Sequence, residues 1–261
     1  MSYPILPDKY QLPAMLTAEQ MIEFRRTHGG LRGMAAPHNV ILCLYKGVMR
    51  RFAWRYPSRR IRGFLGELYL IRRGGERVGV MGNFGIGAPA LTNQAEELIA
   101  WGTGRLVILS LAGGLQPDLT PGSVVVCDRA LRDEGTSYHY LPPGRDVAAS
   151  ARLASSLCDA LSSRGISATV GTAWSTDAPY RETQQEAAQF GREGVLAVDM
   201  ESAGLYAAAQ VRHVEAASVF VIGDNLAGPR WSAPPDMRAL HVRLKEVLGA
   251  LITTLQAEAD R

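Results

Sequence analysis

The sequence predicts a single α/β domain with a twisted, mixed central β-sheet flanked by helices. Short apolar segments alternate with segments of helical periodicity along most of the 261 residues, as in chains that alternate strands and helices around one sheet. Many apolar segments lack polar alternation, which is typical of strands covered by helices on both faces. The length suits one large domain, and we find no linker. We divide the chain into an N-terminal extension, residues 1–38, and one domain, residues 39–261.

The predicted elements follow from apolar runs and from capping residues. The strands are Val40–Tyr45, Glu67–Ile71, Val78–Met81, Leu106–Leu111, Val124–Cys127, Ala168–Ala173, Val195–Val198 and Ala217–Ile222. The helices of the domain are Pro89–Trp101, Val147–Arg164, Glu182–Phe190, Ser202–Val211 and Asp236–Ala257. In the extension we expect a helix over Thr17–Thr27, because Thr17 and Gln20 have the spacing of a capping box.

The composition excludes several classes of protein. No apolar stretch reaches the roughly eighteen residues of a membrane-spanning helix, and the first residues lack the layout of a signal peptide. The three cysteines, Cys43, Cys127 and Cys158, are far apart, which indicates reduced thiols in a cytoplasmic protein. The five histidines show no metal-ligand spacing, so we expect no metal.

A basic run stands out against the small net charge of +3. Met49–Arg62 holds six arginines interleaved with Phe52, Trp54 and Tyr56. Three interpretations stay open for this run. It is a solvated edge of the domain, a nucleic-acid surface with arginines on phosphates and aromatic rings on bases, or an anion site for a small phosphorylated or phosphate-using substrate.

A glycine-rich turn follows one of the predicted strands. Gly85–Ala90 lies between a strand and a helix, which is the arrangement of a dinucleotide-binding turn. That function also needs an acidic residue at the end of the next strand, but Leu106–Leu111 runs into Ala112-Gly113-Gly114 without one. The dinucleotide hypothesis therefore fails. Two glycine-rich strand ends remain, which either bring backbone N–H groups to a small ligand or reflect close packing.

Carboxylates end two other apolar strands. Asp199-Met200-Glu201 precedes an alanine-rich helix, and Asp224 follows Ala217–Ile222. Buried carboxylates are costly unless they are paired or bind a ligand. One carboxylate is able to accept hydrogen bonds from both hydroxyls of a ribose, and another at a strand end is a candidate proton donor. The alternative is that these acids stabilise a helix N-terminus.

Taken in order, these motifs resemble the nucleoside phosphorylase family, of the purine nucleoside phosphorylase and uridine phosphorylase type. The matching segments are Gly85–Pro89, Glu96–Leu98, Ala112–Pro117, Pro121–Val125, Arg132–Ser137, Asp177–Glu182 and Asp199–Ala203, the last resembling the E-M-E-[SA]-A signature. The match runs from about Val40 to Leu255 and leaves the first 38 residues uncovered.

The resemblance implies a function and roles for individual residues. It implies cleavage of the N-ribosidic bond of a purine nucleoside or uridine by a self-associated dimer or hexamer, with inorganic phosphate as co-substrate and no other cofactor. From the rest of the chain we expect neither nucleic acid nor membrane as a partner. Glu201 would hold the ribose hydroxyls and Met200 would pack under the sugar. Tyr180, with Arg181 and Asp199 nearby, would line the substrate site, and Asp224 would protonate N7 of a purine. The base preference tilts towards purine, since the uracil-reading loop is not evident.

The candidate phosphate site departs from the family pattern. We assign it Gly47, Arg51, Arg59, Ser110 and Gly113, with Arg51 and Arg59 as arginines that would compensate for missing family donors. Ile108 and Leu111, however, stand where the family carries an arginine and a threonine, although dianionic phosphate needs several charge-assisted donors. Two alternatives to a phosphorylase therefore stay open, which are a nucleosidase that uses water and a degenerate nucleoside-binding protein. The non-enzyme alternative is a nucleic-acid-binding protein that uses Met49–Arg62.

Overall fold

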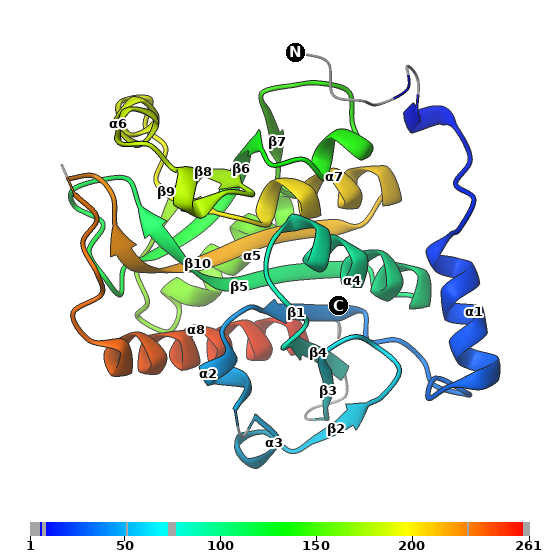
Figure 1. Cartoon of the computed structure of the whole chain (residues 1–261). Coiled ribbons are helices and arrows are strands. Elements are labelled where there is room, and N and C mark those ends of the chain that lie inside the picture. Colours follow the sequence, from blue (N-terminus) through cyan, green and yellow to red (C-terminus); the bar gives the residue numbers. More distant parts are fainter. Residues whose placement is uncertain (1–5, 7–8, 51, 73–76, 229, 258–261) are drawn as a thin grey trace.

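The computed structural model describes residues 6, 9–50, 52–72, 77–228 and 230–257 and shows a mixed sheet between two helical layers (Figure 1). The strands are β1 (Asn39–Cys43), β2 (Ser58–Ile61), β3 (Glu67–Arg72), β4 (Arg77–Gly82), β5 (Arg105–Gly114), β6 (Val124–Asp133), β7 (Asp146–Ala148), β8 (Ala168–Thr176), β9 (Ala197–Asp199) and β10 (Glu215–Asn225). The α-helices are α1 (Ala18–His28), α2 (Lys46–Met49), α3 (Phe52–Arg55), α4 (Ala88–Trp101), α5 (Ala151–Ser162), α6 (Gln184–Arg192), α7 (Ser202–Arg212) and α8 (Met237–Ala257). Short 3-10 helices are η1 (Lys9–Gln11), η2 (Ser137–His139) and η3 (Pro179–Arg181).

The strand pairing makes one part of the sheet close on itself. β1 lies parallel between β4 and β5, and β2, β3 and β4 continue the sheet as antiparallel neighbours. β10 pairs with β5 on one side and with β6 on the other, while β6 leads through β8 and β9 back to β5. This closed ring brings the ends of β5, β9 and β10 together, although they are far apart in sequence.

Helices cover the sheet on two faces and bury two apolar clusters. Leu91 of α4 and Leu205 of α7 belong to one cluster, and Leu157 of α5 and Leu248 of α8 belong to the other. The described part of residues 1–38 joins the first cluster, because α1 packs against α4 and buries Ile22 (Figure 1). Among the described residues, no helix combines the length and apolar character needed to cross a membrane.

The predicted fold class is confirmed, and each predicted strand overlaps a strand of the sheet, although β6 continues to Asp133, beyond its predicted end at Cys127. The capping box of Thr17 and Gln20 is present, and Pro89 lies in the first turn of α4. The prediction of a helix over Val147–Arg164 was wrong at its start, because residues 146–148 pair with β6 as β7 and α5 begins at Ala151. α2, α3 and β2 were missed, since they are short and lie in or just before the basic run, which lacks apolar periodicity.

Candidate active site

A cavity of about 630 Å³ lies where β5, β9 and β10 end, and we call it the carboxylate pocket. Four carboxylates line it, namely Glu182, Asp199, Glu201 and Asp224. The last three of these were predicted site residues, as were Ser110, Gly113, Tyr180 and Met200 on the same wall. The pairing of Gly113 with Val198 of β9 and with Asp224 of β10 explains why these separate motifs meet.

Glu201 is buried at the start of α7 and is held by backbone N–H groups. Its Oε1 accepts a hydrogen bond from the Gly87 N–H at 2.6 Å, and its Oε2 accepts one from the Met200 N–H at 3.3 Å. Burial and the nearby Asp199 raise the pKa of Glu201 from 4.5 to about 7, against the opposing effect of these two bonds. The glycine-rich turn at Gly87 therefore positions this carboxylate.

Asp199 is also buried, but its oxygens are occupied by protein donors. Oδ1 accepts from the Ser175 hydroxyl at 2.5 Å, and Oδ2 accepts from the Ser202 N–H at 2.8 Å and its hydroxyl at 2.7 Å. A third bond to Oδ2 comes from the Glu201 N–H at 3.2 Å. Burial raises the pKa of Asp199, and these hydrogen bonds partly offset that rise. Asp199 thus ties β8 to the beginning of α7 and fixes the backbone that carries Glu201.

Asp224 projects from an irregular point of β10. The pairing with β5 shifts register between Ile222 and Asp224, and such a bulge changes the direction of a side chain. Its Oδ2 accepts a hydrogen bond from the Trp231 indole at 2.5 Å. A Cβ on Gly113 would lie 2.4 Å from Leu226 and 3.4 Å from Asp224 Oδ1. A glycine at position 113 therefore allows the strands to approach closely beside Asp224.

Glu182 is a site residue that the sequence did not identify. It was predicted to begin a helix, but α6 begins at Gln184 behind its N-cap Thr183, and Glu182 lines the carboxylate pocket instead. Burial, then Asp224, then Glu186 raise the pKa of Glu182 from 4.5 to about 7. The signal in the sequence was its place at the end of the matching segment Asp177–Glu182.

The mouth of the carboxylate pocket is apolar and aromatic. Tyr180 is 100% exposed, Ile86 is 67% exposed and Trp231 is 64% exposed, and all three line the cavity. Exposed aromatic rings beside a cavity offer flat surfaces to a planar ligand. Ile86 and Trp231 were not predicted as site residues, because single exposed apolar residues carry no recognisable pattern.

The structure separates the predicted phosphate-binding residues. Ser110 and Gly113 line the carboxylate pocket, whereas Gly47 lines a second hollow between α2 and α8, and Arg59 is exposed on β2. Arg51 lies outside the described residues. The predicted substrate residue Arg181 is exposed beside Tyr180 and is absent from the lining of the carboxylate pocket.

The ionisable side chains on the described lining of the carboxylate pocket are all acids. Ile108 is buried within β5 and Leu111 lines the cavity, so neither side chain supplies a hydrogen-bond donor there. None of the described residues that line the cavity is a lysine or an arginine. Across the described ranges, no three His, Cys, Asp or Glu residues are grouped so as to hold a metal ion.

Comparisons with known proteins show the family of the chain. The model of the phosphorylase superfamily matches residues 52–253. The chain is 32% identical to the DeoD-type purine nucleoside phosphorylases of Bacillus thuringiensis (strain Al Hakam) and Bacillus cereus (strain B4264), over 169 residues that cover 64% of this chain and 70% of each relative.

A solved structure with the same fold is uridine phosphorylase from Vibrio fischeri ES114 complexed with 6-hydroxy-1-naphthoic acid. It superposes with a TM-score of 0.70 and 21% identity, and the match covers 87% of this chain and 93% of that one. The family model and the similarity to curated relatives confirm the prediction made from the ordered motifs: the chain belongs to the phosphorylase superfamily, in the family of the nucleoside phosphorylases.

Proposed function

We propose that the protein cleaves the N-ribosidic bond of a purine nucleoside in the carboxylate pocket and transfers the ribose to phosphate. The observation that carries the proposal is that Glu201 and Asp224, from different elements, line one cavity whose mouth is aromatic. Membership of the family supports the class of reaction. We extend the proposal to self-association as a dimer or hexamer.

The ribose is held by Glu201 and rests on Met200. Each carboxylate oxygen accepts about two hydrogen bonds, so the bond from the Gly87 N–H leaves acceptor sites on Glu201 for the 2′- and 3′-hydroxyls. Cleavage of a glycosidic bond passes through an oxocarbenium-like sugar. A carboxylate that grips the diol fixes the sugar while positive charge develops on it.

The base leaves as a neutral molecule because the pocket supplies a proton. The purine ring lies against Tyr180, and the Glu182–Asp224 pair donates the proton to N7 while the bond from C1′ to N9 breaks. The raised pKa of Glu182, about 7, keeps a proton on this pair near neutral pH. The indole N–H of Trp231 holds Asp224 in position. Uracil lacks an N7, so this arrangement favours purines.

An oxygen of phosphate then bonds to C1′, giving ribose 1-phosphate. The names of the curated relatives support phosphate as the acceptor, and Ser110 and Gly113 are its candidate contacts in the same cavity. A second candidate function is hydrolysis by water. The four carboxylates and the lack of a lining lysine or arginine among the described residues favour it, because a dianion is repelled by carboxylates.

A nucleoside panel with and without phosphate tests both functions. The intact protein is incubated with inosine, adenosine, guanosine and uridine, and free base, ribose and ribose 1-phosphate are measured by chromatography. We expect release of purine bases that requires phosphate, with one ribose 1-phosphate for each base. Base release that does not depend on phosphate and yields free ribose would contradict phosphorolysis and support hydrolysis. No release from any nucleoside would contradict both functions.

A further inference from the structure

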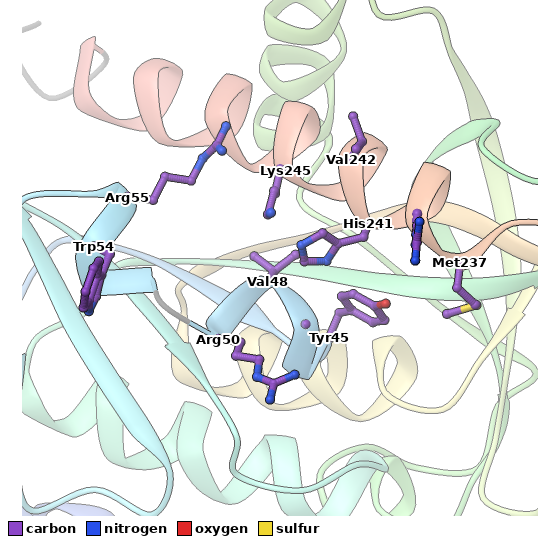
Figure 2. A pocket seen from close by; sticks show the side chains of 11 residues that line it. Tyr45, Val48, Arg50, Trp54, Arg55, Met237, His241, Val242 and Lys245 are labelled. Atoms are coloured by element: carbon purple, nitrogen blue, oxygen red, sulfur yellow. The ribbon is translucent and has the colours of Figure 1, made fainter.

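A second cavity holds part of the basic run, which the proposed reaction does not use. It measures about 880 Å³ and lies between the α2–α3 segment and α8 (Figure 2). We call it the basic pocket, after the basic residues that line it: Arg50, Arg55, Arg238, His241 and Lys245. It shares no lining residue with the carboxylate pocket.

The positive charge of the basic pocket is not compensated by the surrounding protein. None of the described lining residues is acidic. None of its arginines, and not Lys245, forms an ion pair with a carboxylate of the described residues. Burial, then Lys245 and Arg55, lower the pKa of His241, so positive charges from both sides of the hollow act on one ring. Like charges that face one another without a counter-ion favour the binding of an anion.

The floor of the basic pocket is closely packed. The rings of Tyr45 and His241 lie beside each other with centroids 5.8 Å apart (Figure 2). A Cβ on Gly47 would lie 2.5 Å from the Tyr45 ring and 3.0 Å from His241 Nδ1. Glycine at this position therefore lets α2 approach α8. Gly47, which was predicted to bind phosphate, lines the basic pocket instead.

One wall offers an aromatic ring to a ligand. Trp54 on α3 lines the basic pocket and is 90% exposed, although an indole is usually well buried in a protein interior. Arg55, its neighbour in sequence, extends towards α8, where Lys245 projects from the opposite side (Figure 2). A flat ring and several cations on the lining of one cavity suit a ligand that has both a base and phosphate groups.

We propose that the basic pocket binds a nucleoside di- or triphosphate. Its phosphates lie on Arg55, Arg238 and Lys245, where guanidinium groups are able to form bidentate, charge-assisted bonds, and its base stacks on Trp54. The cavity has the size of a small-molecule site, which favours a free nucleotide over a polymer. This binding is separate from the proposed cleavage reaction, because the two cavities share no residue.

Calorimetric titration of the intact protein with ADP tests the proposal at near-physiological salt. We expect the Arg55→Gln/Lys245→Gln double variant to bind ADP at least about tenfold more weakly, since charge-assisted bonds are lost. Trp54→Ala should weaken ADP binding but leave the binding of pyrophosphate unchanged. The matched control is Arg164→Gln/Arg192→Gln, which removes the same charge from exposed positions outside the cavity and should bind ADP like the wild type. Thermal melting verifies that each variant is folded.

Four results would overturn the proposal. The first is no ADP binding by the wild type at millimolar concentration. The second is an equal loss in the control variant, which would indicate a general charge effect. The third is ADP binding that survives Arg55→Gln/Lys245→Gln but is lost in Glu201→Gln, which would assign the nucleotide to the carboxylate pocket. The fourth is single-stranded RNA binding more tightly than ADP through the same residues, which would indicate a nucleic-acid surface.

Discussion

The carboxylate pocket and the basic pocket are lined in part by adjacent residues of the chain, but their lining side chains differ in charge. Leu44 lines the first and Tyr45 lines the second, directly after β1. Four carboxylates and no described lysine or arginine line one cavity, while cations and no described carboxylate line the other. The comparison shows that the family motifs predict which strand ends meet at the carboxylate pocket, but not where the positive charge gathers.

This separation of charge has a chemical consequence. A phosphate in the carboxylate pocket would rely on neutral donors such as the Ser110 hydroxyl, unless a residue outside the described lining contributes a cation. Water, as a neutral attacking molecule, needs no cation beside it. The identity of the attacking oxygen and the occupant of the basic pocket are therefore separate questions, which variants confined to one pocket are able to answer.

The largest effect should come from Glu201→Ala. Loss of two charge-assisted hydrogen bonds to the ribose diol is worth about 4 kcal/mol, so kcat/KM for nucleoside cleavage should fall roughly a thousandfold. Steady-state kinetics with inosine measures it. An active variant would contradict the role of Glu201 and with it the assignment of the carboxylate pocket.

Stability measurements supply the control for this residue. The pKa of Glu201 is raised from 4.5 to about 7 in the folded protein, so the folded state binds the proton more tightly than the unfolded chain. Protonation of Glu201 therefore contributes to the free energy of unfolding. This contribution is fully present below pH 4.5 and is lost as the pH rises through about 7. Glu201→Gln should therefore raise Tm at pH 8 and change it little at pH 4. A lower Tm at pH 8 would mean that the ionised carboxylate stabilises the fold.

Asp224→Asn should have the next largest effect, a loss of about a hundredfold in purine cleavage, because an amide does not donate the proton to N7. Uridine cleavage, if present, should fall much less. Comparing kcat for inosine and uridine in the same variant checks this. Equal losses for both substrates would remove protonation of N7 from the role of Asp224.

Glu182→Gln should slow purine cleavage about tenfold and change its pH profile. Since the pKa of Glu182 is about 7, the protonated acid is abundant below neutral pH and is lost above it. Wild-type kcat should fall as the pH rises through 7, and the variant should lack this decline. Glu182→Asp should restore part of the decline, whereas an unchanged profile in Glu182→Gln would leave the proton on another group.

The smallest effect on cleavage should come from Arg55→Gln/Lys245→Gln. Both residues lie in the basic pocket, so we expect base release, and the KM for phosphate, to stay within about twofold of the wild type, the size of a distant charge effect. A large increase in the KM for phosphate would contradict the separation of the two pockets, because it would show that the basic pocket supplies the phosphate used in cleavage.

Several features of the fold and site were predictable because they are encoded locally. Apolar runs predicted the strands, and the capping pair of Thr17 and Gln20 marked the start of α1. The acids at Asp199-Met200-Glu201 and at Asp224 were identified as strand-end residues, and the structure brings them to one cavity. Arg59 and Gly47 were assigned to the phosphate site by resemblance, but their positions depend on β2 and α8, which are distant in sequence.

The sequence by itself determined the α/β class, the family, and the acids that end β9 and β10, because periodicity and motif order are properties of neighbouring residues. Only the tertiary structure decided that β10 closes a ring with β5 and β6, that Glu182 faces the carboxylate pocket, and that α8 brings Lys245 near Arg55. Burial and long-range pairing set these contacts and the raised pKa values of Glu182 and Glu201. The residues responsible lie far apart along the chain, so no local pattern records them.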